Sequence, residues 1–134
     1  MQLDVRGPRF AAALTTVVLI VIALTRSGWL AAAQAIVFAI GAISARHAPY
    51  GALFRVLVAP RLGPPREVEP AEPVRFAQAV GFVFALVAAI GFLSGATAVG
   101  LIATAFALVA AFLNAVFGLC LGCEAYLLMR RLRA

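Results

Sequence analysis

The stretch TAVGLIATAFALVAAFLNAVFGLCLGCEAYLLM, residues 97–129, decides the fold of this chain. It carries a single charged side chain, Glu124, and as one straight helix of 33 residues it would be about 50 Å long. Because the hydrocarbon core of a bilayer is about 30 Å thick, such a helix crosses it with length to spare. The surplus predicts a tilt, a kink or a protruding end, and Gly118 and Gly122 are the weak points.

The rest of the chain has the same apolar character. Of its 134 residues, 65% are hydrophobic and 12% are charged, against about 25% charged residues in a soluble domain. A soluble domain of this length buries only about two thirds of its chain surface, so the composition excludes a water-soluble monomer. We predict an all-α, integral membrane four-helix bundle that forms a single domain over 1–134, with spans at about 10–25, 28–45, 76–94 and 97–122.

The arginines predict how this bundle lies in the membrane. The eleven basic residues are all arginines, and with five acidic residues they give a net charge of +6. In a four-span arrangement all of them except Arg26 fall on one side, which carries both termini and the connection 46–75. Since cytoplasmic loops are rich in basic residues, we expect a multi-pass protein of a bacterial cytoplasmic (inner) membrane with both termini and the 46–75 loop in the cytoplasm. We expect the first span to be retained, because no small-x-small cleavage site followed by a polar sequence comes after it. No basic stripe with interleaved aromatic residues points to nucleic acid as a partner.

The order of the spans leaves room for an internal repeat. Arg9-Phe10-Ala11 and Arg75-Phe76-Ala77 each stand at the start of an apolar hairpin, which is consistent with two repeated helical hairpins. The alternative interpretation is that any two alanine-rich spans that follow an arginine look alike by chance. Between the hairpins, residues 49–62 are apolar with spaced arginines and too short to cross, which predicts an interfacial helix in the central cytoplasmic loop. Residues 63–73, rich in proline and glutamate, predict an extended cytoplasmic segment.

The residues that could do chemistry stand in the run Gly118-Leu119-Cys120-Leu121-Gly122-Cys123-Glu124. A C-x-x-C pair is the smallest unit for dithiol–disulfide exchange and also for holding a soft metal ion between two thiolates. A third alternative is that both cysteines are small buried apolar residues. The candidate catalytic residues are Cys120, Cys123 and Glu124, whose carboxylate could accept a proton or, alternatively, pair with Arg131. In the metal alternative, Cys120 and Cys123 are the ligands.

The surroundings of the thiols depend on the course of the last helix. If it breaks near Gly118, both cysteines enter the first turn of a new C-terminal cytoplasmic helix, whose dipole favours the thiolate. If it continues unbroken to Arg130, both thiols lie in apolar surroundings that favour the neutral form. The pattern Gly118-x-x-x-Gly122 suits a close helix contact, either within the bundle or in a homodimer.

Several segments of the chain resemble a known family. They are Asp4-x-Arg6-Gly7-Pro8-Arg9-Phe10, Pro49-Tyr50-Gly51-x-x-Phe54-Arg55 and Gly118-x-Cys120-x-Gly122-Cys123-Glu124. Essentially over its whole length the chain is similar to small four-span membrane proteins, common in actinobacteria, that are catalogued as a domain of unknown function. Members occur beside, or fused to, thioredoxin-like and rhodanese-type proteins, and the resemblance therefore implies thiol or sulfane-sulfur traffic at the membrane. Transport of thiosulfate or sulfite would also fit the sulfur-handling proteins beside which family members occur. However, no basic residue lies inside a span to bind an anion.

Together these observations lead us to expect a membrane thiol–disulfide or sulfane-sulfur relay. Cys120 attacks and Cys123 resolves, and the partner is a cytoplasmic thioredoxin-like or rhodanese-like protein. Because the cytoplasm keeps thiols reduced, we expect a cycling disulfide rather than a permanent one. The alternatives are a soft-metal (Cu or Zn) binding or transport protein and a non-enzymatic membrane scaffold. The sequence requires no cofactor: a quinone acceptor is conceivable because the pair lies near the lipid, but no motif identifies a quinone pocket.

Overall fold

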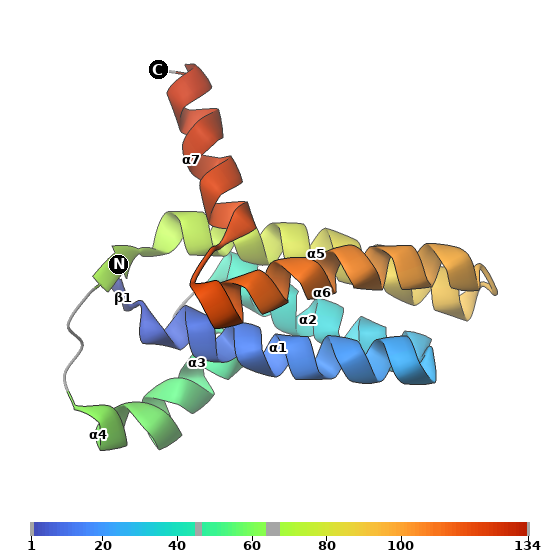
Figure 1. Ribbon diagram of the computed structural model, residues 1–134, viewed down its shortest axis with the longest axis horizontal. Helices are drawn as coiled ribbons and strands as arrows, with labels where there is room; N and C mark the ends of the chain where they lie inside the picture. Colours follow the sequence, from blue (N-terminus) through green and yellow to red (C-terminus); the bar gives the residue numbers. More distant parts are fainter. Residues whose placement is uncertain (1, 45–46, 64–67, 134) are drawn as a thin grey trace.

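The computed structural model describes residues 2–44, 47–63 and 68–133. Four long helices lie along one axis (Figure 1): α1 (Arg6–Thr25), α2 (Gly28–Ile43), α5 (Ala71–Leu93) and α6 (Thr97–Phe117). The other helices are α3 (Pro49–Leu53), the π-helical turn η2 (Phe54–Val58), α4 (Ala59–Leu62) and α7 (Leu121–Arg133). Two short strands, β1 (Gln2–Asp4) and β2 (Val68–Pro70), pair in antiparallel fashion. Arg46 and Arg66, which contribute to the predicted charge asymmetry, lie outside the described residues.

The long helices pack through small side chains. Helix α1 lies against α6, α2 lies against α5, and α5 also contacts α6. Leu19 and Ile22 of α1 are buried in a cluster of alanines, which consists of Ala31, Ala88, Ala89, Ala103 and Ala107. A second cluster joins Phe38 to Ala35 and Ala85. Small residues let helix backbones approach closely, and this is how helices associate where lipid removes the hydrophobic driving force.

The large apolar side chains point outward. Val17 of α1 is 59% exposed, Ile36 of α2 is 61% exposed and Ile102 of α6 is 58% exposed. So many exposed large apolar side chains are unfavourable in water and suited to hydrocarbon. Helices α1, α5 and α6 are each long and apolar enough to cross a membrane, whereas α2 is apolar but only 16 residues long. The predicted all-α class is confirmed, and the three candidate spans indicate a multi-pass membrane protein.

The two ends of the bundle differ in character. At one end, on the right in Figure 1, tight turns join α1 to α2 and α5 to α6. Arg26 closes α1 there in the left-handed conformation (φ 55°), and the Ser27 hydroxyl begins α2 by accepting a hydrogen bond from the Leu30 N–H at 3.1 Å. At the other end lie β1, the helical segment α3–α4 and α7. We call this the basic end, because the described arginines other than Arg26 belong to it: Arg6, Arg9, Arg55, Arg61, Arg75, Arg130, Arg131 and Arg133.

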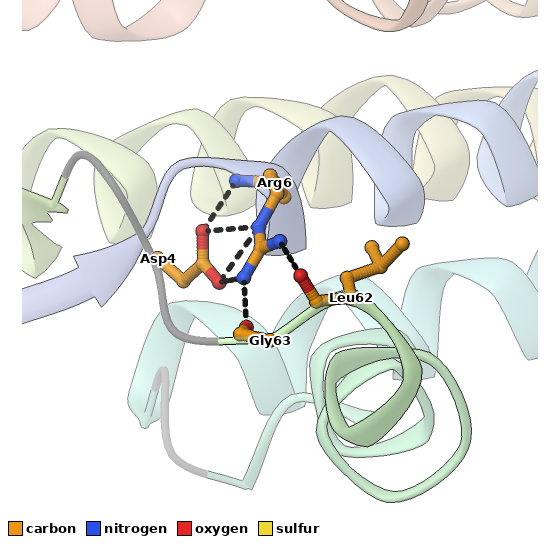
Figure 2. Close-up of polar contacts among 4 residues, drawn as sticks. All are labelled: Asp4, Arg6, Leu62 and Gly63. Carbon is orange, nitrogen blue, oxygen red and sulfur yellow. Dashed lines mark hydrogen bonds and ion pairs between the residues drawn. The ribbon is translucent and has the colours of Figure 1, made fainter.

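The helix predicted over residues 49–62 is present, since α3 passes through η2 into α4. Phe54, which is 3% exposed, anchors it against the Phe10 ring, and the ring centroids are 5.7 Å apart. Figure 2 shows a second anchor, in which Arg6 donates hydrogen bonds to the Asp4 carboxylate and to the backbone carbonyl of Gly63 at 3.0 Å. These contacts fix the segment to the first turn of α1.

Helix α5 begins before the span predicted at 76–94, and the extended segment predicted over 63–73 is wrong at its end. Ala71, Glu72 and Pro73 form the first turn of α5. A proline fits there because the first amides of a helix have no partner inside it, and the Glu72 carboxylate is favourable near the positive end of the helix dipole. Residues 64–67 of the predicted segment lie outside the described part of the chain.

Candidate functional site

The long apolar stretch breaks at Gly118. Helix α6 ends at Phe117, and Gly118 adopts the left-handed conformation with φ 70°. Its N–H donates to the Asn114 carbonyl at 3.0 Å, which satisfies one of the last carbonyls of α6. Glycine takes this conformation without the steric cost of a Cβ atom. Of the two courses that the sequence left open, the structure has the broken one, and the predicted span 97–122 corresponds to a helix that ends at Phe117.

The cysteine pair lies at the start of α7. Cys120 precedes the first helical residue, Cys123 lies in the first turn, and both are half-buried. The two sulfurs form a disulfide, and the Cα atoms are 5.2 Å apart. The Cys123 N–H donates a hydrogen bond to the Cys120 sulfur at 3.1 Å. Backbone N–H groups and the positive end of a helix dipole both favour negative charge, so this position suits a Cys120 thiolate when the pair is reduced.

Close contact with α5 holds the first turn of α7 in place. A Cβ atom on Gly122 would lie 2.6 Å from the Cβ of Ala77 and 2.7 Å from its Cα. One turn further along α7, the Tyr126 ring lies 5.7 Å from the Phe76 ring. Gly122 is therefore packed within the chain. A homodimer through Gly118 and Gly122 stays a prediction.

Arg9 links α1 to the break between α6 and α7. Its Nη2 atom donates to the carbonyls of Ala115 at 3.3 Å and Val116 at 3.2 Å. Its side chain also lies beside Gly118, where a Cβ atom would be 3.7 Å from the Arg9 Nε. The guanidinium thus satisfies carbonyls at the end of α6 and brings positive charge to the segment that carries the cysteines. Sequence analysis assigned Arg9 no role at the cysteine pair, because nothing in its spacing signals a contact with a carbonyl 106 residues away.

A cavity of about 520 Å³ reaches from the basic end into the bundle, and both cysteines line it. Helices α1, α5, α6 and α7 form its walls, and Phe38 contributes from α2. Its polar lining residues are Arg9, Thr15, Gln78 and Asn114, and many of the others are small: Ala12, Ala77, Gly81, Ala107, Ala110 and Ala111. Small residues facing one another leave space that larger side chains would fill. The cavity is a feature that the sequence analysis missed.

Glu124 lies apart from this cavity. It is exposed in the first turn of α7 and is not among the lining residues. Within the described residues its carboxylate makes no ion pair with Arg131. Its role as a proton acceptor stays a prediction.

The soft-metal alternative would require reduction of the Cys120–Cys123 disulfide, because the thiolate is the form of cysteine that binds a metal. Over residues 2–44, 47–63 and 68–133, no group of three or more His, Cys, Asp or Glu side chains is placed to hold an ion. The ring of His47 instead forms a hydrogen bond with the Ser44 hydroxyl at 2.9 Å.

These features define a class of protein: a multi-pass α-helical membrane protein with a cysteine pair at the start of a helix and a cavity beside it. Comparison with family models supplies the family. The chain belongs to the family described as Domain of unknown function (DUF4395), whose model matches residues 3–131. The match covers nearly the whole chain, as the resemblance in sequence implied. No curated protein and no solved structure matches the chain.

Proposed function

We propose that this protein is a thiol–disulfide relay of the bacterial cytoplasmic membrane. The observation that carries the proposal is the half-buried Cys120–Cys123 pair at the start of α7, where a backbone N–H contacts the Cys120 sulfur. In the exchange, the Cys120 thiolate attacks a partner's disulfide, forms a mixed disulfide and releases one partner thiolate. The Cys123 thiolate then attacks the Cys120 sulfur, which closes the Cys120–Cys123 bond and releases the second partner thiolate. Two electrons move from the pair to the partner, and the reverse sequence reduces the pair.

In this proposal α2 is the fourth span. It carries no charged residue, and its 16 residues are about 24 Å long, a length that a bilayer accommodates by local thinning. The helix pairs α1–α6 and α2–α5 are those that two repeated hairpins would form about a twofold axis along the membrane normal. The basic end faces the cytoplasm, because cytoplasmic segments carry the excess of arginine.

The helices at the basic end support this placement. Helix α7 leaves the bundle and runs across its long axis (Figure 1). It exposes Leu128 (57%) and Leu132 (79%) and carries the basic residues Arg130, Arg131 and Arg133 in its last turn. A helix with an apolar stripe and several arginines lies in the plane of the membrane surface. Such a placement puts Cys120 and Cys123 at the cytoplasmic surface, within reach of a soluble protein.

The partner in this proposal is a cytoplasmic thioredoxin-like or rhodanese-like protein. With a persulfide donor, the Cys120 thiolate takes the terminal sulfur and the donor leaves as a thiolate. Attack of the Cys123 thiolate on the Cys120 sulfur then releases hydrosulfide and forms the disulfide. Both versions require the same two sulfur atoms in the same order of attack.

Trapping the mixed disulfide tests the proposal. The Cys123→Ser protein in lipid nanodiscs is mixed with a thioredoxin that keeps only its attacking cysteine, activated as a disulfide with a small aromatic thiol, and adducts are resolved on a non-reducing gel. We expect an adduct with Cys123→Ser and none with Cys120→Ser. The Glu124→Gln variant tests whether Glu124 accepts a proton during exchange. A fall in exchange rate of about tenfold or more would assign that role to Glu124.

Other outcomes would overturn the relay. Failure of both single variants to form an adduct, together with thiols inert to maleimide, would favour a scaffold. Stoichiometric copper or zinc on the purified protein that is lost in Cys120→Ser would favour the soft-metal alternative.

A further inference from the structure

The cavity next to the cysteine pair has the dimensions of a ligand site. Its volume of about 520 Å³ falls within the range of about 300 to 1,000 Å³ that small-molecule sites occupy. Sulfur atoms lie in its wall, and the polar groups Arg9 and Asn114 lie near the same end, because Asn114 is one turn before the break at Gly118. Phe106 is eight residues earlier in α6, and therefore about 12 Å deeper into the bundle. The cavity thus has an end that carries the cysteine sulfurs and the Arg9 guanidinium, and Phe106 lies deeper in the bundle.

An exposed aromatic ring forms part of the cavity wall. Phe106 lines the cavity and is 63% exposed. Its ring lies 6.1 Å from the ring of Phe84, which lines the cavity from α5. A molecule dissolved in the bilayer could enter beside Phe106 without passing through water. This position, within a bundle that exposes large apolar side chains, favours an apolar ligand.

The redox chemistry of the Cys120–Cys123 pair further limits the class of ligand that the cavity could bind. In the reverse direction of the proposed exchange, a partner dithiol reduces the Cys120–Cys123 pair. The reduced pair must pass two electrons on before it can accept two more, so it needs a two-electron acceptor within reach of its sulfurs. An acceptor in this cavity must dissolve in lipid, stack on aromatic rings and offer oxygen atoms to the Arg9 guanidinium and the Asn114 amide. A quinone has all three properties. A lipid acyl chain would fill the apolar walls but would use neither the polar side chains nor the sulfurs.

We propose that this cavity binds a lipid-soluble quinone, which accepts the electrons that the cysteine pair receives. The inference rests on the proposed function and names a second substrate for the same site. In the step, the Cys120 thiolate and the Cys123 thiol form a sulfur–sulfur bond, and the two electrons pass to the quinone. The two quinone carbonyls become hydroxyls by taking one proton from Cys123 and one from a water molecule at the basic end, which is left as hydroxide. The products are the disulfide and a quinol.

The test measures one turnover of the full chain in nanodiscs. The protein is reduced, freed of reductant and mixed with decylubiquinone, and loss of quinone absorbance is followed together with loss of maleimide-reactive thiols. We expect one quinone to be reduced per chain, with two thiols lost. The Cys123→Ser protein should reduce none.

Two substitutions on α6 locate the reaction. Ala110 lines the cavity, and Ala110→Phe should lower the rate of quinone reduction at least tenfold relative to the rate of thioredoxin exchange. Ala105→Phe adds the same ring to an exposed position outside the cavity, and it should leave the quinone rate within twofold of the parent. If Ala110→Phe fails to fold, Asn114→Leu takes its place and should raise the quinone concentration for half-maximal rate at least threefold.

The outcomes separate this inference from the relay itself. Exchange with thioredoxin but no reduction of decylubiquinone would refute the quinone site and leave the relay standing. Absence of both reactions would refute both. The cavity is not the quinone site if Ala110→Phe and Ala105→Phe lower the quinone rate equally. It is also not the quinone site if the purified protein holds a lipid that decylubiquinone does not displace.

Discussion

One methyl group at Gly122 should displace the cysteine pair. The added Cβ would lie 2.6 Å from the Cβ of Ala77 and 2.7 Å from its Cα, whereas carbon atoms in unstrained contact are about 3.5 to 4.0 Å apart. The Ala77 Cα belongs to the backbone of α5, which is held between α2 and α6 and cannot yield by a side-chain rotation. Helix α7 must therefore move away by about 1 Å to restore ordinary contact.

The size of the effect follows from this shift. Overpacking of a close contact costs about 1 to 3 kcal/mol, so Gly122→Ala should lower the free energy of unfolding by about that amount. Misplacement of a reacting group by about 1 Å can lower a rate by about 100-fold. Because Cys120 and Cys123 flank Gly122, we expect the rate of exchange with thioredoxin to fall by about tenfold or more.

The assay compares thermal unfolding and thioredoxin exchange across the parent and four variants in nanodiscs. Gly51→Ala is the matched control, because among the described residues a Cβ there would meet the Ala48 Cβ at an ordinary 3.9 Å. The double variant Gly122→Ala/Ala77→Gly removes the nearer of the two clashing atoms and should recover part of the lost rate. Ala77→Gly alone corrects for the helix propensity of glycine, which is about 1 kcal/mol below that of alanine.

Parent-like stability and exchange in Gly122→Ala would refute the docking of α7 on Ala77. An effect of Gly51→Ala as large as that of Gly122→Ala would show that the loss does not depend on this contact. A double variant with no recovery would mean that the Ala77 Cβ contributes nothing to the clash.

Three further predictions concern the basic end. The side-chain hydrogen bond from Arg6 lowers the pKa of Asp4 below its ordinary value of 3.8. The ionised Asp4 carboxylate therefore contributes its full stabilisation of the fold at a pH above the pKa of the unfolded chain. This contribution is lost as the pH falls through the lowered pKa of the folded protein. Thermal unfolding of Asp4→Asn should therefore lack the part of the acid dependence that the parent shows below about pH 4, and an unchanged pH profile would contradict this assignment. Phe54→Ala should lower the free energy of unfolding by about 3 to 5 kcal/mol, because the ring is 3% exposed, whereas Leu53→Ala at a position 40% exposed should cost clearly less in the same melts. Arg9→Gln should move the alkylation profile of Cys120 in the reduced protein to higher pH, because a positive charge near the thiolate is lost, and Arg9→Lys should restore most of the shift.

Sequence reasoning succeeded where a property depends on neighbouring residues. The apolar content of residues 97–129 is enough to predict a membrane helix, and the spaced arginines of 49–62 are enough to predict a short helix. The spacing of Cys120 and Cys123 marked them as candidates for exchange, metal binding or simple packing, and the disulfide between them comes from the structure. The start of α5 was misjudged because Pro73 indicates either an extended segment or a first helical turn, and the local sequence does not distinguish them.

The sequence by itself determined that this chain is a helical membrane protein with one C-x-x-C pair, because hydropathy and spacing are sums over residues close together in the chain. Only the tertiary structure decided that the last helix breaks at Gly118 rather than Gly122, since the carbonyls before the break receive Arg9 from α1 while Gly122 packs on Ala77 of α5. The cavity beside the cysteines is likewise a product of tertiary structure. It depends on how alanines and glycines from several helices face one another, and the rotation and offset of packed helices are not written in the periodicity of any one of them.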